Sequence, residues 1–191
     1  MTTSNLVRWG ASGFVLGGVV WLVMGLVSAF AVNPMLLMPG SVLFYYYAAL
    51  GALARLLLGV GMVGLHALQK GSYARIGRAG FYAVLVAIAV LILSLLAALA
   101  VSPTLGGLES LVGQLLLIVG FVLYGVASLQ ARVLPRWYAM VLLAFVLISA
   151  LLAALAPPGS SNIWMGAVLL VLGLVLWRRS EAPAEQPPRV R

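Results

Sequence analysis

One arginine, one glutamate and one glutamine stand inside long apolar stretches of this sequence, where charged and amide side chains are rare. Arg55 lies in "LGALARLLLGVGMVGL", and Glu109 and Gln114 lie in "LGGLESLVGQLLL". A guanidinium binds a carboxylate or a phosphate through two parallel hydrogen bonds, and an amide adds a neutral donor and acceptor. The chemistry that these three residues predict is recognition of an anion.

Other reactive groups are scarce. The chain has no cysteine, so it offers no disulfide, thiol nucleophile or thiolate metal ligand, and His66 is its only histidine. No carboxylate stands at metal-ligand spacing from His66. Ser94 and Ser149 lie within apolar runs, where a serine usually bonds to its own helix backbone. The sequence therefore predicts no catalytic residue, no metal site and no cofactor, and a protein that is not an enzyme.

Apolar segments must position these few polar groups. Of 191 residues, 64% are hydrophobic and 7% are charged, against roughly 25% charged in soluble domains. The apolar residues form six runs near the length of about 20 that crosses a bilayer core as a helix. We place the runs at about 9–31, 43–66, 80–101, 108–130, 137–156 and 163–178. This pattern predicts an all-α integral membrane protein, with a six-helix bundle over residues 1–179 and a disordered tail over 180–191.

The first run raises the question of a signal peptide. Its apolar stretch is longer than the roughly 7–15 residues of a signal-peptide core. We therefore expect it to be retained as the first helix.

The basic residues predict an orientation in the membrane. The net charge is +8, and every Lys or Arg except Arg55 falls in the N-terminal segment, the second or fourth connection, or the tail. The other three connections, 32–42, 102–107 and 157–162, have none. Positive residues favour the cytoplasmic side. We therefore expect a cell-membrane protein with both termini in the cytoplasm, whose basic residues face anionic lipid headgroups rather than nucleic acid.

The chain also carries a weak internal repeat. Segments 81–100 and 137–156 agree at 11 of 20 positions, and segments 55–63 and 114–122 agree at six of nine. These matches predict three tandem helical hairpins of the same orientation, which are parallel repeats about an axis along the membrane normal.

Small and aromatic residues suggest how the helices pack. Gly13 and Gly17 form a GxxxG pattern, which lets a second helix approach closely. We expect them to pack within the bundle, while docking onto a second copy or a partner membrane protein stays open. Tyr45, Tyr46 and Tyr47 are expected in an interfacial aromatic belt, with a ligand-stacking role as the alternative.

Arg55 falls near the middle of its run, where an arginine costs about 2.5–3.5 kcal/mol on insertion scales. It must therefore face protein or water. The repeat aligns Arg55 with Gln114 and places Glu109 about 7.5 Å nearer the outer surface at helical rise. We expect Arg55 to contact Glu109 or Gln114, directly or through water.

Two functions follow from this cluster. The first is non-enzymatic binding or transport of a small anionic or amphipathic molecule at an outward-facing site formed by Arg55, Glu109 and Gln114. The alternative is a structural or accessory membrane subunit, in which Arg55 and Glu109 only hold two helices in register.

Overall fold

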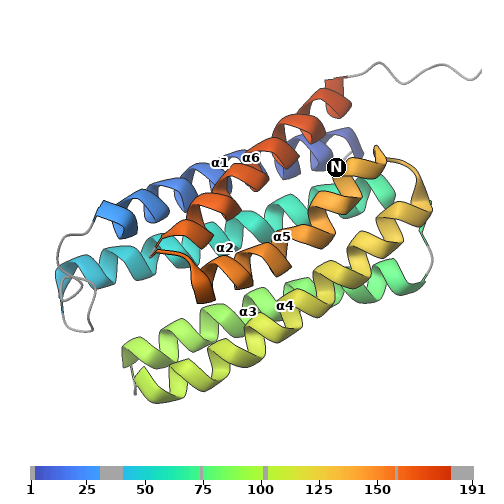
Figure 1. The fold of residues 1–191 in the computed structure, drawn as a ribbon. Coiled ribbons are helices and arrows are strands. Elements are labelled where there is room, and N and C mark those ends of the chain that lie inside the picture. The colour runs from blue at the N-terminus through green and yellow to red at the C-terminus, as the bar shows by residue number, and fades with distance from the viewer. Residues whose placement is uncertain (1–2, 31–40, 74, 101–102, 158, 182–191) are drawn as a thin grey trace, which may run out of the picture.

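The computed structural model describes residues 3–30, 41–73, 75–100, 103–157 and 159–181, without the side chains of 103–110, 146 and 153 (Figure 1). The predicted tail and the first outer connection therefore lie almost wholly outside the described residues. Within these residues the chain forms six α-helices and no strand. The helices are α1 (Thr3–Phe30), α2 (Val42–Gln69), α3 (Arg75–Ala100), α4 (Pro103–Ala131), α5 (Arg136–Leu155) and α6 (Ser160–Glu181).

All six helices coincide with the predicted apolar runs, and they begin one to six residues earlier. Five of them are long and apolar enough to cross a membrane, judged by length and composition. In α5 the apolar part Arg136–Leu152 is shorter than these five helices. A helix of 28 residues such as α1 measures about 42 Å. Its ends therefore extend beyond a hydrocarbon core of about 30 Å.

Local sequence explains where the helices begin and end. The Ser41 hydroxyl accepts a hydrogen bond from the Phe44 amide at 3.0 Å and caps α2. Pro103 occupies the first position of α4, where a missing N–H costs nothing. Arg132 has a φ of 53°, which turns the chain away just after α4, and Pro135 precedes the start of α5.

The helices form a closed ring around a common interior. Each helix packs against its neighbours in sequence, and α1 also packs extensively against α6, which closes the ring. The α1–α2, α1–α6 and α3–α4 contacts are extensive, whereas α2 meets α3 only sparsely. Figure 1 shows α3 and α4 side by side below the other helices. Helix α1 packs extensively against both α2 and α6, so the contacts do not divide the bundle into three separate hairpins. The three-hairpin repeat therefore stays a prediction.

Glycines set the close contact between α1 and α2. A Cβ atom at Gly10 would lie 2.5 Å from the Cα atom of Gly64, so neither position has room for a side chain. A Cβ at Gly13 would lie 2.8 Å from the Leu57 carbonyl oxygen, and one at Gly17 would lie 3.2 Å from the Leu57 Cβ. Gly13 and Gly17 are thus buried against α2 within the bundle.

The two ends of the bundle differ. The start of α1, the end of α6 and the α2–α3 and α4–α5 connections lie at one end (Figure 1). We name this the basic end, because the following residues lie there: Arg8, Lys70, Arg75, Arg78, Arg132, Arg136, Arg178 and Arg179. The ends of α1, α3 and α5 and the starts of α2, α4 and α6 lie at the opposite end, which we name the loop end.

The interior towards the basic end is filled. Its fully buried side chains come from several helices and include Phe14, Met62, Phe121, Tyr124, Tyr138, Leu142 and Leu176. Here α2 and α4 meet, since Ser128 donates a hydrogen bond of 2.9 Å to the side-chain carbonyl of Gln69 and both residues are buried. The side chains therefore seal the bundle at this end.

Candidate functional site

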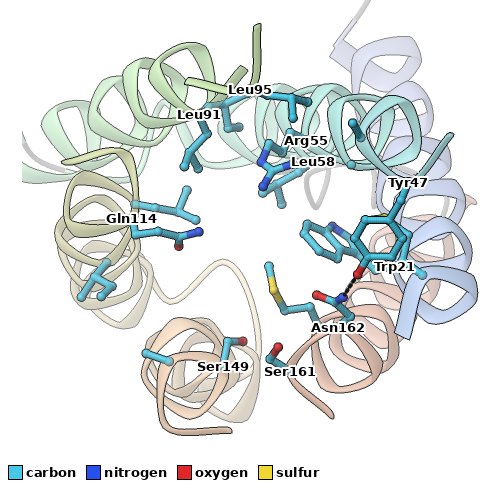
Figure 2. A pocket seen from close by; sticks show the side chains of 18 of the residues that line it. Trp21, Tyr47, Arg55, Leu58, Leu91, Leu95, Gln114, Ser149, Ser161 and Asn162 are labelled. Carbon is cyan, nitrogen blue, oxygen red and sulfur yellow. Dashed lines mark hydrogen bonds between the residues drawn. The ribbon is translucent and has the colours of Figure 1, made fainter. Parts of the chain in front are cut away.

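A cavity of about 630 Å³ occupies the interior towards the loop end. All six helices line it, and Figure 2 shows their side chains pointing inward from every side. Most of the lining is apolar, with Leu58, Ile88, Leu91, Leu95, Leu117, Ile118 and Met165 among its members. Ligand sites usually enclose about 300–1,000 Å³ and combine apolar walls with a few polar groups. The cavity has the size and composition of such a site.

Arg55 projects from α2 into this cavity and is partly buried (Figure 2). Its Cζ atom lies 5.7 Å from the centroid of the Trp21 ring, within the range of a cation–π contact. Among the residues that the structure describes, its guanidinium has no hydrogen-bond or ion-pair partner. Trp21 itself is only 7% exposed. Arg55 therefore presents hydrogen-bond donors to the cavity beside an aromatic wall.

Gly51 explains how the arginine fits. It lies one helical turn before Arg55, and a Cβ at this position would lie 2.9 Å from the Arg55 Nη1 atom. Side chains on a helix lean back towards its N-terminus. The guanidinium therefore folds over Gly51 towards the loop end, along its own helix.

The three residues of the predicted polar cluster have different outcomes. Gln114 lines the cavity and extends into it from α4, on another wall from Arg55 (Figure 2). The two side chains form no direct hydrogen bond. Glu109 belongs to α4, but its side chain lies outside the described residues, so its contact with Arg55 stays a prediction. The structure thus brings Arg55 and Gln114 to one cavity without joining them.

A chain of hydrogen bonds ties three helices together beside Arg55. The Asn162 amide donates to the Tyr47 hydroxyl at 2.7 Å, which also pairs with the Ser28 hydroxyl at 2.8 Å. Ser28 in turn bonds to the Met24 carbonyl at 3.0 Å. This chain fixes Tyr47 against α1 and α6. Tyr45 and Tyr46 are exposed, as a membrane-facing belt requires, so Tyr47 alone of the three lines the cavity.

The two serines bond to their own helices. Ser149 lines the cavity and donates to the Phe145 carbonyl at 2.6 Å, and Ser94 donates to the Val90 carbonyl at 2.8 Å. Both bonds confirm the sequence expectation. The cavity therefore holds no serine hydroxyl that is paired with a base in the described residues.

His66 lies towards the basic end, far along α2 from the cavity. Its Nδ1 atom is hydrogen-bonded to the Tyr73 hydroxyl, and its ring stacks on Phe81 with centroids 4.1 Å apart. Burial raises the pKa of the Tyr73 hydroxyl, which lies in the α2–α3 connection, so this phenol stays neutral. Within the described part of the chain, no group of three or more His, Asp or Glu residues is arranged to hold a metal ion.

Sequence reasoning gave Tyr47 a ligand-stacking role only as the alternative to the aromatic belt, and it missed Gly51, Trp21 and Asn162 as cavity residues. Tyr47 and Gly51 stand eight and four positions before Arg55, so they share its helix face, and this spacing was available as a signal. Trp21 and Asn162 come from α1 and α6, and nothing in the sequence connects them with Arg55. Only the closure of the ring places them in one cavity.

Comparisons with protein-family models, curated proteins and solved structures gave no match to this chain. Function therefore has to be inferred from the cavity and its side chains.

Proposed function

We propose that this membrane protein binds or transports a small anionic or amphipathic molecule in the cavity around Arg55. The observation that supports this is an arginine with no hydrogen-bonding partner among the described residues, placed in a largely apolar cavity of about 630 Å³. A buried charge without a hydrogen-bonded partner is costly. An anionic ligand that pairs with Arg55 would offset this cost and explain why an arginine stands at this position.

Catalysis is not part of this proposal. The described residues that line the cavity include no histidine, aspartate, glutamate or cysteine. Their polar groups are hydroxyls, amides, the Trp21 indole N–H and one guanidinium, which recognise a ligand but do not readily exchange protons near neutral pH.

The accessory-subunit alternative receives less support. It needs a docking face, and the GxxxG pair was the sequence's candidate for one. Gly13 and Gly17 instead lie against α2 inside the bundle. A purely structural Arg55–Glu109 pair remains the competing explanation of the arginine, and the variants in the Discussion separate the two.

Ligand retention tests the proposal. We expect protein purified from its native membrane to carry a small molecule that native mass spectrometry detects. Ala150 lines the cavity, and a tryptophan there would fill part of it, so Ala150→Trp should remove most of the bound mass. Leu151→Trp is the matched control, since Leu151 is the next residue of α5 and is exposed. Equal occupancy in both variants would place any bound molecule elsewhere.

We also propose that the basic end faces the cytoplasm, where its cations contact anionic lipids, and that the cavity lies in the outward-facing half. The absence of cysteine allows single-cysteine labelling. Gly71 at the basic end and Pro157 at the loop end are both exposed. In intact cells an impermeant maleimide should label Pro157→Cys, and should label Gly71→Cys only after permeabilisation. The reverse pattern would invert the orientation.

A further inference from the structure

The described residues that line the cavity bring a single positive charge to it. Among the lining residues that the structure describes, Arg55 is the only ionised side chain. We propose that the cavity selects molecules that carry one negative charge on a mostly apolar body. This inference rests on the proposed function and adds the charge class of the ligand.

The surroundings of the guanidinium favour a monoanionic, planar head group such as a carboxylate. Trp21 lies beside the guanidinium, and the backbone of α2 at Gly51 lies beneath its Nη1 atom. The remaining N–H groups are free of protein partners in the described residues. A carboxylate can accept two parallel hydrogen bonds from the two N–H groups of such a fork. A lysine ammonium could not donate this pair of parallel bonds, because it acts as a point charge.

The walls favour an apolar body. Leu91 and Leu95 face the cavity from α3, and Trp21 and Tyr47 form an aromatic wall on another side of it (Figure 2). Part of the neutral polar capacity is already used, because Tyr47 and Asn162 bond to each other and Ser149 bonds to its backbone. Within the described residues, the Gln114 amide and the Trp21 indole N–H remain without a hydrogen-bond partner. A ligand with more polar groups than these few partners can satisfy would therefore lose hydration without full compensation.

The same balance disfavours other charge states. A neutral analogue leaves the guanidinium unpaired, and a cation adds repulsion to it. A dianion places a second negative charge in an apolar enclosure, where no second cation lies among the described lining residues. Selective binding of monoanions therefore distinguishes this kind of site from an apolar cavity that any hydrophobic molecule could fill.

A series of ten-carbon compounds that differ only in their charged or polar groups tests this charge selectivity. The probes are decanoate, decan-1-ol, decane-1,10-dioate and decylammonium, each titrated at neutral pH against the purified protein in lipid nanodiscs. Empty nanodiscs give the partition background. We expect decanoate to bind about tenfold or more tightly than decan-1-ol, the gain of one charge-assisted bidentate pair. The dianion and the cation should bind more weakly than decanoate.

Two variants locate the effect. Arg55→Gln keeps a polar side chain of similar reach, and the decanoate preference over decan-1-ol should fall to about twofold or less. Gly51→Ala introduces a Cβ 2.9 Å from the Nη1 atom, which is too close, so it should reduce the same preference by displacing the guanidinium.

The outcomes separate the inference from the proposed function. Equal affinities for decanoate and decan-1-ol, or a dianion that binds as tightly as decanoate, would overturn the charge selectivity while leaving the cavity a binding site. Retention of the decanoate preference in Arg55→Gln would also overturn it. If no probe binds saturably above the nanodisc background, the proposed function itself fails.

Discussion

Arg55→Leu is expected to abolish retention of the anionic ligand while leaving the protein folded. The substitution removes the guanidinium from the cavity and replaces it with an apolar side chain that the lining accepts. Replacing a buried ionic group by an apolar one is often nearly neutral for stability. The loss in affinity should reach about a hundredfold, as truncation of a desolvated charge partner typically costs about 2–5 kcal/mol. Native mass spectrometry measures retention, and thermal unfolding in detergent monitors the fold.

Arg55→Lys sharpens this experiment. A lysine keeps the charge but offers no planar fork, so retention should remain low. Glu109→Gln is the control for the structural explanation. If Arg55 serves only to pair with Glu109, both Arg55→Leu and Glu109→Gln should lower the unfolding temperature modestly, and neither should change ligand retention. A ligand retained at wild-type level by Arg55→Leu would exclude the site proposed around this residue.

Gly64→Ala is expected to produce a large loss of stability, because the added methyl group meets the backbone of α1. A Cβ at Gly64 would lie 2.5 Å from the Gly10 Cα and 2.8 Å from the Leu6 carbonyl oxygen. Both atoms belong to the backbone of α1, so no flexible side chain can move aside. Overpacking of a closely packed interior costs about 1–3 kcal/mol, and a backbone contact belongs at the upper end of that range. Thermal unfolding of the two proteins in the same detergent measures the difference.

Gly59→Ala is the matched control on the same helix. The nearest atom to a Cβ at Gly59 is the Ile88 Cδ1 at 3.7 Å, an ordinary contact distance. This variant should unfold at the wild-type temperature or a few degrees above it, since exchanging glycine for alanine in a helix is otherwise favourable by about 1 kcal/mol. If both variants unfold alike, α1 and α2 do not approach each other as closely as the structure shows.

The amino-acid sequence by itself determined the six helices. A bilayer offers no hydrogen bonds to an open backbone, so each apolar run of adequate length must become a helix. The runs at 43–66 and 137–156 became α2 and α5 for this reason. The sequence likewise required Arg55 to avoid lipid, because the cost of exposing its charge to hydrocarbon does not depend on the fold. Its location in the lining of a cavity is consistent with that requirement.

The tertiary structure decided which side chains share the interior. Lipid tails and protein interiors are similarly apolar, so hydrophobicity does not tell an inward-facing leucine such as Leu91 from an exposed one such as Leu93. For the same reason the sequence did not show that Tyr47 lines the cavity while Tyr45 and Tyr46 are exposed. Closure of α6 onto α1 brought Asn162 to Tyr47, and the ring placed Gln114 across a cavity from Arg55 without a direct bond. Such contacts depend on how closely helix backbones approach, which is set by the fit of facing side chains across helices that are distant in sequence.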